Sequence, residues 1–201
     1  NRIGEIRSWL EGTPQPELVY EVAREWGDLA LSLGEFDEAR HAYRDIALPA
    51  ARLHHTAQDV LTIKQALATV ATEAGDFGGA IEILKDAAEE SGRILGPNHP
   101  HTLISRNNLA FAYQAAGRLN EAIPLFEKTL TAQEQLLGPD HPHTLISRNN
   151  LASTYRAAGR LNEAIPLFEE TLKARTRVLG PNHPDTLISR NNLAMACAAA
   201  D

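Results

Sequence analysis

The decapeptide HTLISRNNLA occupies residues 101–110 and returns unchanged at 143–152, and DTLISRNNLA follows at 185–194. Each occurrence lies in a longer unit that begins at Gly96, Gly138 or Gly180, so the period is 42 residues. The two complete units are identical at 32 of 42 positions. A fixed period of this length predicts a stack of equivalent structural units.

Weaker copies of the unit precede Gly96. The spacing of Leu109, Gly117 and Ala122 recurs 42 residues earlier at Leu67, Gly75 and Ala80, and recurs once more after a step that is one residue shorter. We therefore expect a single array over residues 1–201. Its parts are a leading helix at 1–11, divergent repeats at 12–53 and 54–95, well-matched repeats at 96–137 and 138–179, and a half repeat of one helix at 180–201.

Each repeat has the pattern of two helices, which we call helix A and helix B. Pro100 suits the first turn of helix A, and Gly117 suits its end. We expect Asn120 to cap helix B and Pro124 to lie in its first turn, where N–H groups have no intrahelical partner. One such hairpin cannot bury its apolar residues alone, whereas stacked hairpins share a continuous core. The sequence therefore predicts an all-α solenoid.

Composition and charge narrow the range of possible functions and partners. No run of eighteen apolar residues indicates a membrane span, and no signal peptide is present. The chain starts at Asn1, so we expect a fragment of a longer cytoplasmic protein. Residues 1–95 carry 9 basic and 17 acidic residues, and residues 96–201 carry 10 and 9, which argues against nucleic acid as a partner. The single Cys197 excludes an internal disulfide; it stands in the place of Tyr113, so we expect it to be buried.

Signals of catalysis or metal binding are weak. Histidines recur between the repeats, but no cysteine or carboxylate completes a tetrahedral set at zinc spacing, so we expect a structural loop role for them. The sequence contains no Walker loop, no GxGxxG and no GxSxG. We expect neither an enzyme nor a cofactor or metal. The histidines in question are His99, His101, His141, His143 and His183, with His54 and His55 upstream.

The repeat resembles the tetratricopeptide repeat (TPR) family. The resemblance rests on Leu109, Ala110, Tyr113, Gly117, Ala122 and Phe126, and on the matching Leu151, Ala152, Tyr155, Gly159, Ala164 and Phe168. The 42-residue period and the LGPDHP segment are similar to the kinesin light chain variety, which many bacterial signalling proteins carry beside an NTPase, kinase or DNA-binding domain. The resemblance implies a right-handed superhelix whose concave groove is lined by A helices. It also implies protein or peptide binding without catalysis by the array.

The family's usual Trp is replaced by Arg106, Arg148 and Arg190. A helical wheel places these arginines on the buried stripe with Leu109 and Tyr113. We expect their stems to pack and their guanidinium groups to reach an acidic residue at the edge.

The opposite face of helix A should form the ligand groove. It carries Ile104, Asn108 and Phe111, then Ile146, Asn150 and Ser153, then Ile188, Asn192 and Met195. On its flank lie Asn107, Asn149 and Asn191, together with Gln114 and Arg156.

The asparagines lower helix propensity by about 0.5–0.7 kcal/mol each relative to alanine, so something offsets them. One explanation is function: an amide both donates and accepts, and so can hold the backbone of an extended peptide. In TPR proteins of known type, an asparagine matching Asn108, Asn150 and Asn192 does this. Two alternatives stay open. The flank asparagines can bridge neighbouring A helices, and recent duplication copies residues whatever their role.

Two further expectations concern partners. The first repeats replace the amides of the groove face with Glu21, Glu25, Asp28 and Glu73, so this end of the groove should be acidic and suit a basic ligand segment; the alternative is an ordinary solvated face. The second hypothesis is a regulatory array that docks an attached effector domain. The last helix, residues 184–200, is apolar enough at Leu187, Leu193 and Met195 to pair with another copy.

Overall fold

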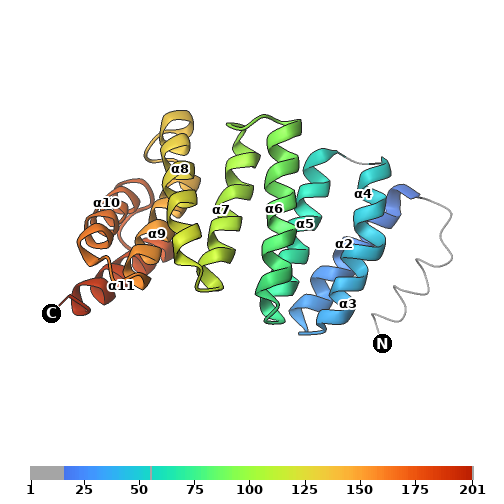
Figure 1. The fold of residues 1–201 in the computed structure, drawn as a ribbon, viewed down its shortest axis with the longest axis horizontal. Coiled ribbons are helices and arrows are strands. Elements are labelled where there is room, and N and C mark those ends of the chain that lie inside the picture. The colour runs from blue at the N-terminus through green and yellow to red at the C-terminus, as the bar shows by residue number, and fades with distance from the viewer. Residues whose placement is uncertain (1–15, 55, 201) are drawn as a thin grey trace. The chain divides into compact units, whose positions relative to one another are not determined.

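The computed structural model describes residues 16–54 and 56–200, and every regular element in these ranges is a helix. The predicted all-α class is therefore confirmed. The leading helix expected at residues 1–11 lies outside the described residues. The chain divides into two compact units, residues 1–97 (unit 1) and 98–201 (unit 2), and each is described separately below. Figure 1 labels their helices.

Unit 1 contains two antiparallel helical layers from the divergent repeats. Its elements are α2 (Pro16–Ser32), α3 (Phe36–His41), the π-helical η1 (Ala42–Ala47), α4 (Leu48–His54), α5 (Ala57–Glu73) and α6 (Phe77–Ile94). Helix B of the first repeat is thus split into α3, η1 and α4. Pro49, the second residue of α4, has no N–H to donate to a carbonyl of η1, so the widened turn lies where the regular hydrogen-bond ladder is interrupted.

The core of unit 1 is built around Trp26, Tyr43 and Ile63, which are completely buried. Gly27 allows α2 to approach η1 closely, because a Cβ atom there would lie 2.4 Å from the Tyr43 ring. The Tyr43 hydroxyl donates a hydrogen bond to Asp28 at 2.5 Å. Burial, and then this bond, raise the pKa of Tyr43 far above its ordinary value.

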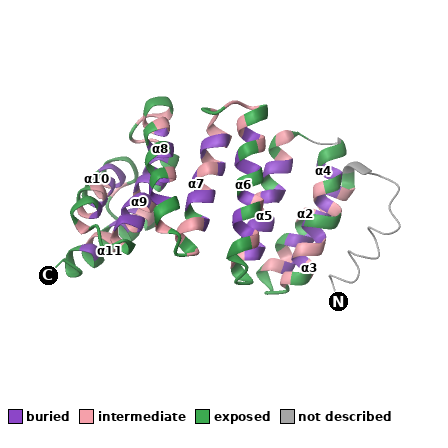
Figure 2. Cartoon of the chain, in the orientation of Figure 1, coloured by how far each residue is buried: buried purple, intermediate pink, exposed green. Residues whose placement is uncertain are grey.

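Unit 2 contains the well-matched repeats. Its helices are α7 (Pro100–Ala115), α8 (Leu119–Leu137), α9 (Pro142–Ala157), α10 (Leu161–Leu179) and α11 (Pro184–Ala198). Each packs against the next along the chain, and the A helices α7, α9 and α11 also contact one another in sequence. Phe126 and Phe168 are completely buried between them, beside the small Ala122 and Ala164. Figure 2 shows buried residues along all these helices.

Helix starts in unit 2 agree with the sequence for A helices and differ for B helices. Pro100 occupies the first turn of α7 as expected, and Gly117 has φ +72° after it. Helix α8 begins at Leu119 with Arg118 as its N-cap residue, so the expectation that Asn120 caps it is wrong. For the same reason Pro124 lies in the second turn of α8, not the first, where its missing N–H removes one intrahelical hydrogen bond.

Within residues 16–54 and 56–200, no helix combines the length and the apolar character needed to cross a lipid bilayer.

Candidate functional site

The A helices of unit 2 present one face that carries the predicted ligand residues. We call it the A-helix face and define it as Ile104, Asn108, Phe111, Ile146, Asn150, Ser153, Ile188, Asn192 and Met195. Its apolar members Phe111, Ile146, Ile188 and Met195 are exposed, although side chains of this size are usually buried. The three asparagines are half-buried, as are Ile104 and Ser153. Exposed apolar groups therefore alternate with half-buried amides on three neighbouring helices.

The flank asparagines make contacts between A helices. Asn107 is 8 % exposed, and its Oδ1 accepts a hydrogen bond of 2.8 Å from the Ser147 hydroxyl of α9. Asn149 Oδ1 accepts a hydrogen bond of 3.1 Å from Asn192 Nδ2 of α11. The bridging alternative thus holds for Asn107 and Asn149. Asn192 takes part as well, but one such bond leaves its second N–H and its carbonyl lone pairs available.

The last flank asparagine differs from the first. Asn191 is exposed, and its Nδ2 lies 3.6 Å from the sulfur of Met195 on the same helix. The remaining flank residues, Gln114 and Arg156, are half-buried. Gln114 Oε1 and Arg156 Nε are enclosed without a hydrogen-bond partner among the described side chains. The flank is therefore a mixture of bridging groups and unsatisfied polar atoms.

Equivalent asparagines should therefore respond differently to alanine. We expect Asn107→Ala to lower the free energy of unfolding of unit 2 by about 1 kcal/mol, because loss of a buried hydrogen bond outweighs the gain in helix propensity. Asn191→Ala, the matched control, should be neutral or raise it by about 0.5 kcal/mol. Urea unfolding followed by circular dichroism measures both. Equal effects would show that the Asn107–Ser147 bond contributes nothing.

The arginines at the family's Trp position are placed differently in each copy. Arg148 is buried and donates to Glu134 Oε1 at 2.5 Å, as predicted. Arg106 is half-buried. Arg190 is exposed, so the prediction of a buried stripe is wrong there. Cys197 is also exposed, contrary to expectation. Both residues lie on α11, which is packed against α9 and α10 but, within the described residues, has no following helix to cover them.

Polar groups between the helices of unit 2 fix their register. The Tyr155 hydroxyl of α9 donates to Glu127 of α8, and burial together with this bond raises the pKa of Tyr155 to about 12. Arg175 of α10 donates to the Asp185 carbonyl at 3.0 Å and to the Ser189 hydroxyl at 2.8 Å on α11. Burial lowers the pKa of Arg175, but a guanidinium stays charged at neutral pH. These contacts hold the helices that carry the A-helix face.

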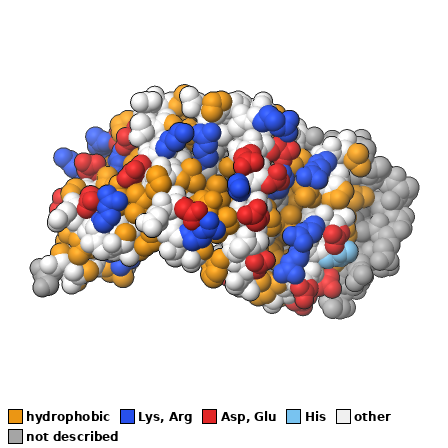
Figure 3. Space-filling model, in the orientation of Figure 1, with side chains coloured by type: hydrophobic (Ala, Val, Ile, Leu, Met, Phe, Trp, Pro, Cys, Tyr) orange, Lys and Arg blue, Asp and Glu red, His pale blue; other side chains and the backbone are white. Residues whose placement is uncertain are grey.

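The acidic residues predicted for the first repeat lie on the exposed side of α2. Glu21, Glu25 and Asp28 are all exposed, as is Glu73 of α5. Arg24 forms ion pairs with Glu21 at 3.2 Å and with Asp28 at 3.3 Å. Figure 3 shows acidic and basic side chains lying next to one another on the visible face of unit 1. The acidic character of α2 is thus partly compensated on the same helix.

Lys64 is a structural residue that the sequence did not single out. It is 3 % exposed on α5, and its Nζ donates to Asp86 at 2.6 Å and to Glu90, both on α6. It stands 42 residues before Arg106, so its place in the repeat is the one that a cation also occupies in the later copies. That equivalence was the signal that could have identified it.

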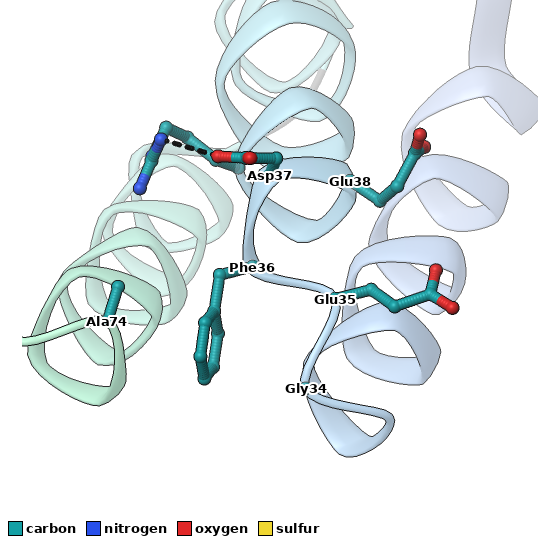
Figure 4. A pocket seen from close by; sticks show the side chains of 7 residues that line it. Gly34, Glu35, Phe36, Asp37, Glu38 and Ala74 are labelled. Atoms are coloured by element: carbon teal, nitrogen blue, oxygen red, sulfur yellow. Dashed lines mark hydrogen bonds and ion pairs between the residues drawn. The ribbon is translucent and has the colours of Figure 1, made fainter.

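A surface cavity of about 490 Å³ lies at the turn between α2 and α3. Figure 4 shows Phe36 beside Ala74 in this cavity. Asp37 forms an ion pair of 3.0 Å with Arg40. The Asp37 side chain on the rim of the cavity is 97 % exposed, and none of the residues that line the cavity belongs to the repeated HTLISRNNLA segment. The repeated arrangement of the A-helix face is therefore the stronger candidate for ligand binding.

Comparison with known proteins identifies the repeat. A family model described as tetratricopeptide repeat matches residues 59–135, 103–175 and 147–201, which together cover more than half of the chain. The chain belongs to the TPR family. No protein with a curated description matches it significantly.

Solved structures show the same TPR architecture. A protein from Podosopora anserina with nearly identical TPR-like repeats, described as a kinesin light chain, is 27 % identical, with 94 % of this chain and 89 % of that chain covered and a TM-score of 0.77. BtubC (BKLC) from P. vanneervenii is 22 % identical over 98 % of this chain and 80 % of its own, with a TM-score of 0.79. The apo form of RapI is 14 % identical over 98 % and 74 %, with a TM-score of 0.73. The last two show a shared fold only.

Proposed function

We propose that this TPR chain is a non-catalytic interaction module that binds an extended peptide, or an extended segment of a partner protein, along the A-helix face of unit 2. The observation that carries the proposal is the threefold recurrence of a half-buried asparagine beside exposed apolar side chains on neighbouring helices. TPR repeats generally serve protein interaction, and the proposal locates that role on named residues.

The chemistry of the face suits a peptide backbone. Asn108, Asn150 and Asn192 each present an amide that can donate to a carbonyl and accept from an N–H. A strand of peptide exposes both groups on every residue, so these contacts need no particular peptide side chain. Phe111, Ile146, Ile188 and Met195 supply apolar area for side chains that project from the peptide. We therefore expect a ligand with apolar residues and modest sequence preference.

The experiment compares two sets of asparagine substitutions. A peptide selected from a displayed library against the complete chain is titrated by calorimetry against Asn108→Ala/Asn150→Ala/Asn192→Ala. Loss of three hydrogen bonds at roughly 0.5–1.5 kcal/mol each should weaken binding roughly 10- to 1,000-fold. The matched control is Asn120→Ala/Asn162→Ala, which removes exposed asparagines from the B helices α8 and α10. Equal affinity of both variants would refute the proposed site.

For unit 1 we propose that Glu21 and Glu25 favour a basic segment of the ligand. Both carboxylates are exposed, and Arg24 compensates only part of the charge of α2. Binding of a peptide with a basic end should weaken with added salt. The variant Glu21→Lys/Glu25→Lys should reduce both the affinity and its salt dependence. If the variant binds as the parent does at low salt, this part of the proposal is wrong.

A second candidate function is self-association through α11. Leu187 is 46 % exposed, whereas the equivalent Leu103 and Leu145 are 0 % and 2 % exposed. A second copy that packs on α11 would bury this surface; an attached effector domain could do the same. Sedimentation velocity across a concentration range tests the first possibility. A dimer that Leu187→Asp abolishes supports self-association, and a monomer at all concentrations excludes it.

A further inference from the structure

The A helices of unit 2 share one unusual start. His99, His141 and His183 are the N-cap residues of α7, α9 and α11, and each is followed by proline. In each case the ring Nδ1 accepts a hydrogen bond from the backbone N–H two residues later, on His101, His143 and Asp185 respectively. All three bonds measure 3.2 Å. The same cap is therefore built three times.

A histidine cap works in one protonation state only. A neutral imidazole has one nitrogen that donates and one that accepts, so acceptance at Nδ1 requires the proton on Nε2. Protonation turns Nδ1 into a donor that faces another donor, the backbone N–H. It also places a positive charge at a helix N-terminus, where the helix dipole is already positive. Both effects oppose the capped conformation.

The neighbouring groups strengthen this effect for α7 and α9. The rings of His99 and His101 lie 5.4 Å apart, as do those of His141 and His143. Burial lowers the pKa of His143, and His141 and the His101 ring of α7 lower it further. The folded chain therefore disfavours the protonated form of His143, two residues after the cap of α9. Charged groups at this end of the described helices include Asp140, whose carboxylate pairs with Arg177 of α10 at 2.5 Å, and Asp185.

The cap of α11 has a compensating charge. Asp185 Oδ2 lies 3.9 Å from His183 Nδ1. The backbone carbonyl of Asp185 is bound by Arg175 of α10, which keeps the first turn of α11 attached even when the cap is lost. The caps of α7 and α9 should consequently be more acid-sensitive than that of α11.

We propose that the three histidine caps make unit 2 an acid-sensitive element, in which protonation between about pH 7 and pH 5 releases the first turns of α7 and α9 while unit 1 stays capped. In unit 1 the caps are Thr56 on α5 and Asp76 on α6, whose side chains accept from Asp59 and Gly79. A threonine hydroxyl does not titrate, and an aspartate keeps its charge above about pH 5.

The sign of the effect follows from linkage. His143 is not itself a cap, but its lowered pKa acts in the same direction as loss of the caps, because at this group the folded chain binds fewer protons than the unfolded chain. The contribution of His143 to stability is complete above the unfolded histidine value of about 6.5 and is lost as the pH falls below it. Acid therefore destabilises unit 2. The released turns belong to helices that carry the A-helix face.

Amide exchange measured by NMR tests the proposal at the capped N–H groups themselves. Protection factors, corrected for the intrinsic effect of pH, are compared at pH 7.5 and pH 5.0. We expect protection of the His101 and His143 amides to fall by roughly fivefold or more, the size of a typical lost cap, while Gly79 stays unchanged. Unchanged protection at His101 and His143 would overturn the proposal.

Two further measurements make the test specific. The variant His99→Asn/His141→Asn/His183→Asn keeps a capping acceptor that does not titrate, so it should stay helical and lose the pH dependence. If the dependence instead persists in it and disappears in His101→Gln/His143→Gln, the caps are not the sensor. Nitrogen shifts of the wild-type rings report the tautomer without any substitution. A proton on Nδ1 of His99 and His141 at pH 7.5 would also contradict the proposal.

Discussion

Replacement of Phe126 by alanine is expected to lower the free energy of unfolding of unit 2 by about 3–5 kcal/mol. The ring is completely buried on α8 and belongs to the core that also contains Phe168, Ala122 and Leu130. Its removal exposes apolar surface to a cavity that rigid helices cannot close. Because stability in a repeat array depends on contacts between neighbouring helices, α7 and α9 should both lose support.

Phe111→Ala is the matched control for this prediction. It removes the same side chain from a position that is 51 % exposed on α7, so its effect should stay within about 1 kcal/mol. Urea unfolding of the complete chain, followed by circular dichroism at 222 nm, measures both variants. Similar losses for Phe111→Ala and Phe126→Ala would contradict the assignment of the core.

The double variant Asp86→Asn/Glu90→Gln is expected to cost unit 1 about 2–3 kcal/mol. It leaves the buried ammonium of Lys64 without a carboxylate, and an uncompensated buried charge is strongly destabilising. The loss is at the low end of such effects because the Asp86 side chain is 65 % exposed, so solvent screens its part of the interaction.

Removal of the Lys64 charge itself should leave the stability of unit 1 almost unchanged. Lys64→Met keeps a long side chain in the buried position and leaves two carboxylates that can turn to water, so its stability should lie close to that of the parent. Glu89→Gln changes an exposed carboxylate on α6, the helix that also carries Asp86 and Glu90, and so controls for loss of charge alone. Stability is again measured in urea. The ion-pair account is wrong if the double variant is as stable as Lys64→Met.

The fold could be predicted from the repeat for two reasons. Helix ends depend on the backbone conformations that glycine and proline allow, and helix packing depends on the spacing of small and apolar residues. Gly117 could be identified as a helix end and Pro100 as a helix start from their conformational limits alone. The start of α8 was misplaced, since Asn120 looked like a cap and the structure uses Arg118, whose side chain does not cap. A capping residue in the sequence competes with packing, and here the helix begins two residues earlier than a cap at Asn120 would allow.

Equivalence in sequence predicted burial only where equivalent neighbours exist. Arg148 and Tyr155 are buried, whereas Arg190 and Cys197, which occupy the matching positions one repeat later, are exposed. Periodicity describes one helix, but burial is decided by the helices that surround it. The Lys64 ion pairs were missed for the same reason, because their partners lie on another helix at no fixed distance in sequence.

The site was partly accessible from sequence. The helical wheel placed Phe111, Ile146, Ile188 and Met195 on the outer side of the A helices, and all four are exposed. It could not separate the amides that bridge helices from those that remain available. That distinction depends on whether a partner such as the Ser147 hydroxyl lies within hydrogen-bonding distance, and on the side-chain rotamer of each asparagine. The histidine caps carried a signal that was not used: a polar residue directly before a proline at a helix start is at the N-cap position.

The most direct test of the central claim is an NMR titration of the complete chain with a peptide selected against it. The side-chain amide signals of Asn108, Asn150 and Asn192 should shift saturably with one dissociation constant, while those of Asn120 and Asn162 on the B helices stay in place. Shifts confined to Asn120 and Asn162, or saturable binding that moves none of the three A-helix amides, would contradict the assignment of ligand binding to the A-helix face.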